Sequence, residues 1–184
     1  MINQVWKEFA AHEVSHSVAH YLITLLELHE RLGYARVSDV ARELEVTKGS
    51  VSVQMKQLKE KGFVSEDENR FLLLTELGET EARRVIRTRL VFMEFLHTVL
   101  GLDRDLAEID ACKIEHLLSE EVTRQLLGLV ELLHSDDPDA RRLRKKLKDF
   151  EVECPTLEEC PLCEEQCLVE VDPCRDRRPP KKAK

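Results

Sequence analysis

Three residues in the second half of the chain combine a thiol, a carboxylate and an imidazole at helical spacing. Cys112, Glu115 and His116 stand at positions i, i+3 and i+4, so on a helix they share one face within reach of a single ion. These groups are transition-metal ligands, and three on one turn leave coordination positions open for a donor from elsewhere. The spacing indicates one half of a metal site. It is also compatible with a buried cysteine beside a surface Glu and a surface His.

A second group of candidate ligands lies near the C-terminus. Five of the six cysteines are Cys154, Cys160, Cys163, Cys167 and Cys174. The close pair Cys160 and Cys163 is typical of both Zn²⁺ sites and iron–sulfur clusters, and the spacing does not choose between them. Unmetallated thiolates among the neighbouring glutamates would repel one another, so we expect this segment to fold only around its ion. The alternative is a flexible tail of redox-active thiols.

The first long helix is predicted from apolar residues at helical spacing between about 13 and 32, where Gly33 ends the pattern. Its other face carries His12, His16 and His20 at successive i+4 steps. These imidazoles could be metal donors or a solvated polar stripe. For His12 and His16 we expect the solvated stripe.

A helix-turn-helix follows. Residues 37–44 form a short helix that we expect Ser38 to cap, and after a tight turn at 45–47 a second helix covers 48–61. Two short apolar runs, 63–66 and 71–74, flank a polar turn and predict a β-hairpin. A helix-turn-helix followed by such a hairpin is a winged helix.

The second helix of this motif is the expected DNA-reading element. Small or amide side chains suit base edges, and lysines give a local positive charge that the whole chain, with net charge −8, lacks. We assign to the DNA interface, together with Arg70 of the hairpin turn, the residues Thr47, Lys48, Ser50, Gln54, Lys56 and Gln57. Lys59 and Lys61 add to the same basic patch.

The next predicted elements include the segment with Cys112, Glu115 and His116. Thr75 is expected to cap a long helix to about residue 100, where Gly101 breaks it. Asp103 opens a short helix, and the helix of the ligand triplet covers about 108–118. Each of these boundaries follows from capping and helix-breaking residues.

A Ser119-capped helix runs to about residue 133 with an apolar stripe that must face either a dimer partner or the core. The stripe consists of Val122, Leu126, Leu127, Val130 and Leu133. From 139 to 150 a basic segment is expected to be a solvated helix, the alternative being a second phosphate contact.

These elements predict a mainly α protein of three parts. A winged helix-turn-helix domain covers 1–75, a helical metal-binding and dimerisation domain covers 76–150, and a Cys-rich tail with a disordered basic end covers 151–184. No apolar run is long enough to cross a membrane, and no secretory leader is recognised, so we expect a cytoplasmic protein. Cys112 and His116 could be a nucleophile and its base, but no glycine-rich anion loop accompanies them, so we do not expect an enzyme.

The sequence resembles the diphtheria-toxin-repressor and manganese-transport-regulator family of metal-dependent transcription repressors. The resemblance covers about residues 16–133 and rests on the order and spacing of three motifs. They are Gly33-Tyr34-Ala35-Arg36-Val37-Ser38-Asp39, Leu74-Thr75-Glu76-Leu77-Gly78, and Cys112-Lys113-Ile114-Glu115-His116 with Ser119-Glu120-Glu121-Val122.

The resemblance implies a ligand set. Cys112, Glu115 and His116 match three ligands of the family's regulatory metal site, and His20 matches the position from which the DNA-binding domain donates its own ligand. The family usually has Asp or Met there, but imidazole is a competent donor. A set of one thiolate, two imidazoles and one carboxylate fits Fe²⁺, Zn²⁺ or Co²⁺ better than Mn²⁺. The resemblance to the family implies iron first, with manganese second.

Two departures bear on the number of ions. Ile23 stands where manganese-type members have a carboxylate, and Thr88 where the family commonly has a His, which puts the usual two-ion manganese site in doubt. The function implied is a homodimeric repressor of metal-uptake genes that binds a palindromic operator in double-stranded DNA when loaded with Fe²⁺ or Mn²⁺. The alternative is a winged-helix regulator that senses redox state through an iron–sulfur cluster or thiols of the tail.

Overall fold

The computed structural model describes residues 14–149. The chain divides into two units, 1–144 and 145–184, and the description below concerns the first. His12 and the five tail cysteines lie outside the described residues, and so does the Zn²⁺ or iron–sulfur site expected there. In the described residues, no helix is long and apolar enough to cross a membrane.

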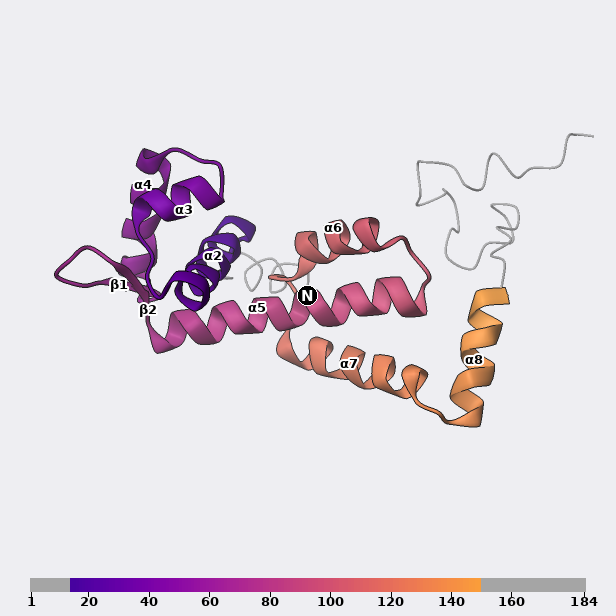
Figure 1. Ribbon diagram of the computed structural model, residues 1–184. Helices are drawn as coiled ribbons and strands as arrows, with labels where there is room; N and C mark the ends of the chain where they lie inside the picture. The colour runs from indigo at the N-terminus through magenta and orange to yellow at the C-terminus, as the bar shows by residue number, and fades with distance from the viewer. Residues whose placement is uncertain (1–13, 150–184) are drawn as a thin grey trace, which may run out of the picture. The chain divides into compact units, whose positions relative to one another are not determined.

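The element order confirms a winged helix followed by a helical part (Figure 1). The elements are α2 (His16–Leu32), α3 (Val37–Glu43), α4 (Lys48–Glu60), β1 (Val64–Glu66), β2 (Leu72–Leu74), α5 (Glu76–Glu94), the π-helical turn η1 (Phe95–Val99), α6 (Arg104–Ile114), α7 (Glu120–His134) and α8 (Pro138–Asp149).

Helix α2 is the centre of the winged-helix part, residues 14–75. The Ser15 hydroxyl caps it by accepting a hydrogen bond from the Val18 amide at 3.3 Å. Its apolar face is buried against α3, β2 and α5. The fully buried side chains of this core include Leu22, Leu25 and Leu28 of α2, Val40 of α3, Val51 and Leu58 of α4, and Leu72 of β2.

The start of α3 differs from the expectation. The helix begins at Val37 and its N-cap is Arg36, whose carbonyl oxygen accepts from the amides of Asp39 and Val40 at 2.9 and 3.0 Å. Ser38 is therefore inside the first turn and does not cap it. The Arg36 side chain instead stacks on the wing, with its guanidinium carbon 4.5 Å from the centre of the Phe71 ring.

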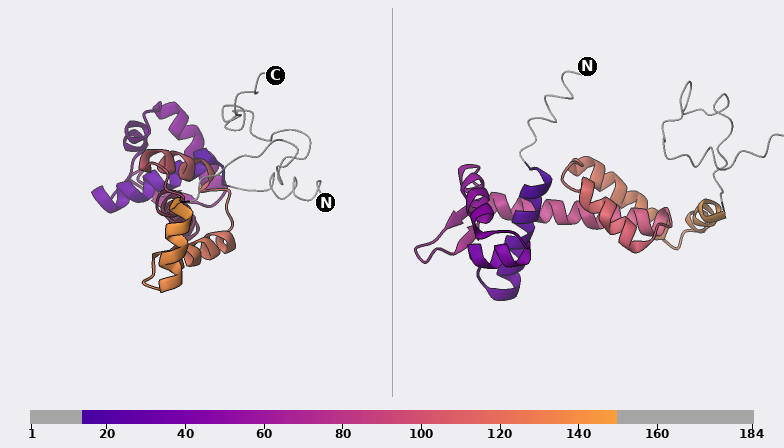
Figure 2. Two further views of the ribbon diagram at one scale, coloured as in Figure 1. Left: turned by 90° about the vertical axis from the view of Figure 1, so that its right-hand side faces the viewer. Right: turned by 90° about the horizontal axis from the view of Figure 1, so that it is seen from above.

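The wing is a two-stranded antiparallel hairpin in which Val64 pairs with Leu74 and Glu66 with Leu72. Its turn is closed by the Asp67 carboxylate, which accepts from the Phe71 amide at 2.7 Å. Figures 1 and 2 show the hairpin loop extending away from the neighbouring helices. Arg70 in this loop is exposed.

A tight junction fixes the wing to the start of α5. The Thr75 hydroxyl accepts from the Gly78 amide at 3.1 Å and lies 2.7 Å from the Gly62 carbonyl oxygen, to which it donates. A Cβ added at Gly78 would come within 2.0 Å of the Phe63 carbonyl oxygen. Only glycine permits this approach of two backbones.

Helix α5 links the winged-helix part to the helical part, and it packs against α2, α6 and α7. In Figure 1, α6 lies along one side of α5 and α7 along the other. The expected helix of 75–100 is confirmed except that its last turn widens to the π-helical η1, after which Gly101 adopts φ 72°. Between Asp103 and the triplet there is one helix, α6, and it ends at Ile114 rather than at about 118.

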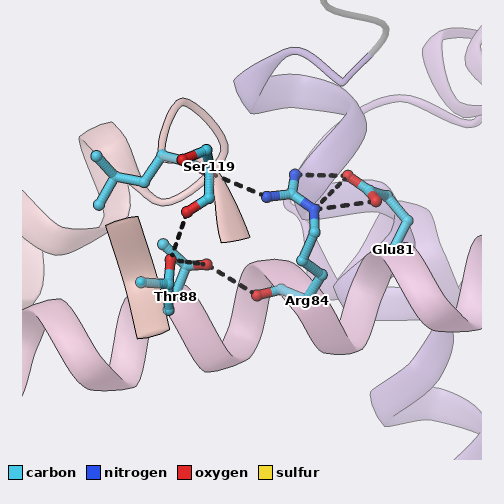
Figure 3. Close-up of polar contacts among 6 residues, drawn as sticks. Glu81, Arg84, Thr88 and Ser119 are labelled. Atoms are coloured by element: carbon cyan, nitrogen blue, oxygen red, sulfur yellow. Dashed lines mark hydrogen bonds and ion pairs between the residues drawn. The ribbon is translucent and has the colours of Figure 1, made fainter. Parts of the chain in front are cut away.

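A polar contact holds the turn before α7 against α5 (Figure 3). The Arg84 guanidinium donates to the Leu118 carbonyl oxygen at 3.2 Å, and the Glu81 carboxylate fixes the same guanidinium at 2.6 Å. Leu118 lies two residues after His116, so this contact also restrains the segment of the predicted metal ligands.

Thr88 is part of the same interface and is almost fully buried. Its hydroxyl lies 3.0 Å from the Arg84 carbonyl oxygen and 3.2 Å from the Thr123 hydroxyl, which in turn lies 3.1 Å from the Ser119 carbonyl oxygen (Figure 3). The hydroxyls of Thr88 and Thr123 have one hydrogen each, so only two of these three hydrogen bonds can form at the same time. Thr88 is therefore engaged in packing α5 on α7.

The apolar stripe of α7 is divided between the core and the surface. Val130 and Leu133 are buried, whereas Val122 and Leu127 are exposed. Further exposed apolar side chains lie beside them and on α6, namely Leu106, Ile109, Leu129 and Leu132. Exposed apolar surface of this kind is typical of a subunit contact.

Candidate metal centre and DNA interface

Four potential ligands from two distant segments meet between α2 and α6. They are His16, His20, Cys112 and Glu115, whose ligand atoms all lie within 4.8 Å of one another. The His20 Nε2 atom is 3.2 Å from the Cys112 Sγ atom, although 92 residues separate them in the chain. Within residues 14–149 this is the one group of three or more His, Cys, Asp and Glu side chains with such spacing.

The local structure explains how the donors converge. His16 and His20 lie one turn apart at the start of α2, with ring centres 4.5 Å apart. Cys112 is in the last turn of α6, and Glu115 is the C-cap residue that follows it. The Leu117 amide donates to the Ile114 carbonyl oxygen at 2.8 Å, a tight turn that replaces the expected helix at this point.

His116 lies beside this cluster rather than within the group of four. Its side chain is buried, and its ring centre is 5.4 Å from that of His16. Of the four predicted ligands, the structure therefore brings His20, Cys112 and Glu115 into one group and places His116 next to it. His16, which we expected to be solvated, is exposed but has a nitrogen within the group.

The two shifted pKa values in the cluster affect metal binding in opposite directions. Burial lowers the pKa of His20, and the adjacent His16 lowers it further, which favours the neutral imidazole that binds metals. Burial raises the pKa of the Cys112 thiol, and the Glu115 carboxylate raises it further. An ion must therefore displace a proton from Cys112 when it binds.

Donor spacing offers a test of whether these residues fit an ion. Nitrogen and sulfur ligands about 2.0–2.3 Å from one tetrahedral ion are roughly 3.5 Å apart. The observed 3.2 Å between His20 and Cys112 matches this spacing, and the remaining donors are within 4.8 Å. The residues fit one transition-metal ion after small side-chain adjustments.

The Glu115 carboxylate has a second partner. Its side chain is 0% exposed and both oxygens contact the Arg89 guanidinium of α5, Nε with Oε2, and Nη2 with Oε1 at 2.9 Å. The hydrogen bonds to Glu115 raise the pKa of Arg89. A charge-assisted bidentate pair of this kind fixes the orientation of the carboxylate.

The residues predicted to contact DNA lie mainly on the outer face of α4. The Thr47 hydroxyl caps the helix by accepting from the Ser50 amide at 3.1 Å. Ser50 and Gln57 are exposed, Gln54 is half-buried, and these residues oppose the buried side of α4. The predicted amide and hydroxyl groups therefore share one accessible face.

The basic patch is smaller than the sequence indicates. Lys48 and Lys56 are exposed, whereas Lys59 forms an ion pair with Glu66 of β1. An ion pair neutralises the lysine, so Lys59 contributes less to the positive charge of α4.

An apolar residue belongs to the same outer face and was not among the predicted contacts. Val53 is 62% exposed, more than any other exposed large apolar side chain in the described residues. It lies three residues after Ser50 and one before Gln54, on the side away from Val51 and Met55. An apolar side chain in this position suits the methyl group of thymine.

Sequence reasoning thus missed three side chains. His16 precedes His20 by one helical turn but was expected to be solvated, and Val53 could have been identified from its place opposite the apolar side of α4. No spacing signal links Arg89 to Glu115, since 26 residues separate them.

Both parts of the chain match family models. Residues 13–71 match the model described as iron dependent repressor, N-terminal DNA binding domain. Residues 75–141 match the model described as iron dependent repressor, metal binding and dimerisation domain.

The chain is also similar to individual regulators. The HTH-type transcriptional regulator MntR of Bacillus subtilis is 30% identical over 133 residues, which make up 71% of this chain and 93% of that protein. An uncharacterized HTH-type transcriptional regulator of Methanocaldococcus jannaschii is 31% identical over 114 residues, or 61% of this chain and 91% of that protein.

Solved structures show the same fold. The T. acidophilum IdeR structure has a TM-score of 0.52 at 27% identity and covers 60% of this chain, and the manganese regulator SloR has a TM-score of 0.55 at 26% identity and covers 61%. The match spans about half of each of those chains, 52% in both cases.

Proposed function

The chain belongs to the diphtheria-toxin-repressor and manganese-transport-regulator family of metal-dependent transcription repressors, and from this premise we propose that one ion bound between α2 and α6 switches its affinity for DNA. Members of this family bind operator DNA and dimerise. The comparisons give no support to a regulator that senses redox state through the tail cysteines.

The contact between His20 and Cys112 is the observation that carries the proposal. His20 is on α2 of the DNA-binding part, and Cys112 is on α6 of the metal-binding part. An ion that both residues bind ties the position of one part to that of the other. Metal binding then changes DNA affinity by restricting the arrangements in which two DNA-binding parts meet one operator.

Glu115, His116 and His16 complete the proposed ligand set. Glu115 supplies a carboxylate, and His116 remains a proposed ligand because its ring lies next to His16 at the edge of the cluster. Nitrogen, sulfur and oxygen donors together favour Fe²⁺ or Zn²⁺ over Mn²⁺. The iron dependent repressor models and the manganese regulator that the chain resembles support Fe²⁺ first and Mn²⁺ second, with Zn²⁺ a further candidate. The bound ion supplies a positive centre that holds donors of two segments together.

The DNA interface is proposed to be the outer face of α4 with the wing. Gln54 and Gln57 would read base edges, Val53 would contact a thymine methyl group, and Lys56 and Arg70 would contact phosphates. Thr47, Lys48 and Ser50 at the start of α4 complete this set. Sequence preference then depends on the amides and Val53, and general affinity on the cations.

Exposed apolar side chains on α6 and α7 are the proposed homodimer surface. Ile109 and Leu132 are more than half exposed, and burying such side chains stabilises association. A two-fold dimer presents two copies of α4, so the operator should be a palindrome with half-sites about one helical turn or a multiple apart. Repression of metal-uptake genes is the corresponding biological role.

Selection of binding sites tests this function. Full-length protein is prepared without oxygen and incubated with random duplex DNA in the presence of Fe²⁺, of Mn²⁺, or of a chelator. We expect a palindromic sequence to be enriched only with metal. Equal enrichment of the same sequence with the chelator would show a DNA-binding module that does not respond to metal.

A further inference from the structure

One carboxylate in the metal centre serves two cations. The Glu115 side chain is 0% exposed, and the Arg89 guanidinium contacts both of its oxygens while retaining 23% exposure of its own side chain. A buried carboxylate that lacks a partner is strongly destabilising. Arg89 therefore stabilises Glu115 in the metal-free protein.

The same carboxylate also belongs to the ligand group with His20 and Cys112. Two carboxylate oxygens offer about four acceptor positions, of which a bidentate guanidinium uses two. An ion can therefore bind Glu115 without displacing Arg89. Because arginine keeps its proton in proteins, its positive charge remains next to the bound ion.

We propose that Arg89 is a built-in counterion of Glu115, which holds the metal-free site in shape and opposes ion binding, and so sets the metal affinity of the regulator. This inference rests on the proposed function. Arg89 acts through Glu115 and is a positioning residue, since its own group binds no metal.

Charge explains why Arg89 should weaken metal binding rather than strengthen it. In the metal-free site the guanidinium already cancels the charge of the carboxylate. A divalent ion then adds positive charge to a partly buried site whose carboxylate is already paired, and like charges in such a site repel one another more strongly than in water. Without Arg89, the ion would be the sole counterion of Glu115. The metal-bound form would then be more stable relative to the metal-free form, and metal would bind more tightly.

The guanidinium also limits the number of ions. It occupies one acceptor position on each oxygen of Glu115, and its fixed positive charge would repel a second ion beside the first. Thr88, on the adjacent position of α5, is engaged with Thr123. We therefore expect one ion per chain at this centre.

Cobalt binding to full-length variants tests the inference. The five tail cysteines are replaced by Ser, so that Cys112 is the single thiol and the Co²⁺–thiolate absorption reports this centre alone. Arg89→Gln removes the charge and keeps a hydrogen-bonding amide, whereas Arg89→Lys keeps the charge. Arg31→Gln is the matched control, because it removes an arginine charge from the Glu43 pair, which lies outside the cluster.

We expect Arg89→Gln to lower the melting temperature of the metal-free protein by about 10 °C and to tighten Co²⁺ binding by at least about tenfold. Arg89→Lys should bind Co²⁺ like the parent, and Arg31→Gln should change neither quantity. Weaker or unchanged Co²⁺ binding by folded Arg89→Gln would overturn the inference, since it would make Arg89 a scaffold for Glu115 only.

Two further results are informative. If Arg89→Gln is unfolded without metal, recovery of the parent circular dichroism on adding Co²⁺ supports the inference, and failure to recover it contradicts the inference. Absence of the Co²⁺–thiolate band in the parent protein itself would instead refute the proposed metal centre, whatever Arg89→Gln does.

Discussion

The replacement of His20 by alanine tests the central feature of the site, an ion shared by two parts of the chain. The substitution removes one nitrogen donor, and with it the 3.2 Å contact with Cys112. Structural zinc sites with four ligands bind with about 10–16 kcal/mol, or roughly 3 kcal/mol per donor. We therefore expect His20→Ala to weaken metal binding by about 100-fold.

The effect on DNA binding should exceed the effect on metal binding. With enough Co²⁺ to refill the site, Cys112 and Glu115 still hold the ion, but only the exposed His16 still connects it to α2. Metal should then raise DNA affinity much less than in the parent protein. The lost hydrogen bond to Cys112 is worth about 1 kcal/mol, so the fold should be retained.

Two measurements check this prediction. Titration with Co²⁺, followed by the thiolate absorption in the variant without tail cysteines, gives the metal affinity, and fluorescence anisotropy with the selected operator gives DNA affinity with saturating metal and with a chelator. His29→Ala is the control, because His29 is on the same helix but outside the cluster. A folded His20→Ala protein with the parent's metal affinity and metal response would refute the shared site.

Further predictions concern the other donors, the fold and the DNA interface. His16→Ala should weaken Co²⁺ binding by about tenfold, since water can replace an exposed donor; unchanged titration would exclude it as a ligand. Because the pKa of Cys112 is raised, its thiol must lose a proton to bind metal, so Co²⁺ affinity should rise about tenfold per pH unit between about pH 7.5 and 8.5, and a flat profile would contradict thiolate ligation. Gly78→Ala should destabilise the protein by about 3 kcal/mol in urea, because its Cβ would meet a carbonyl oxygen at 2.0 Å, whereas Gly49→Ala, with its nearest atom at 3.8 Å, should not. Val53→Ala should reduce the preference for thymine at one operator position by about 1 kcal/mol, measured by competition between thymine and uracil, and equal loss on both duplexes would exclude a methyl contact.

Local patterns in the sequence predicted the winged helix and one half of the metal site. Apolar periodicity, the caps at Thr47 and Thr75 and the hairpin turn depend on neighbours within a few residues, and such interactions can be read directly from the chain. The spacing of Cys112 and Glu115 is a local feature of the same kind. The prediction that Ser38 caps α3 was wrong, because the N-cap of α3 is Arg36. The Arg36 side chain packs on Phe71 of the wing, a contact between distant residues that local sequence does not indicate.

Tertiary structure decided which distant side chains meet. The contact of His20 with Cys112 needs α2 and α6 to pack on the same helix, α5, and no periodicity encodes that packing. Arg89 likewise reaches Glu115 only because α5 lies against α6. The sequence by itself therefore determined the elements and the types of candidate ligand, through short-range geometry. Long-range packing decided that the Arg89 guanidinium pairs with Glu115, the carboxylate of the candidate metal centre.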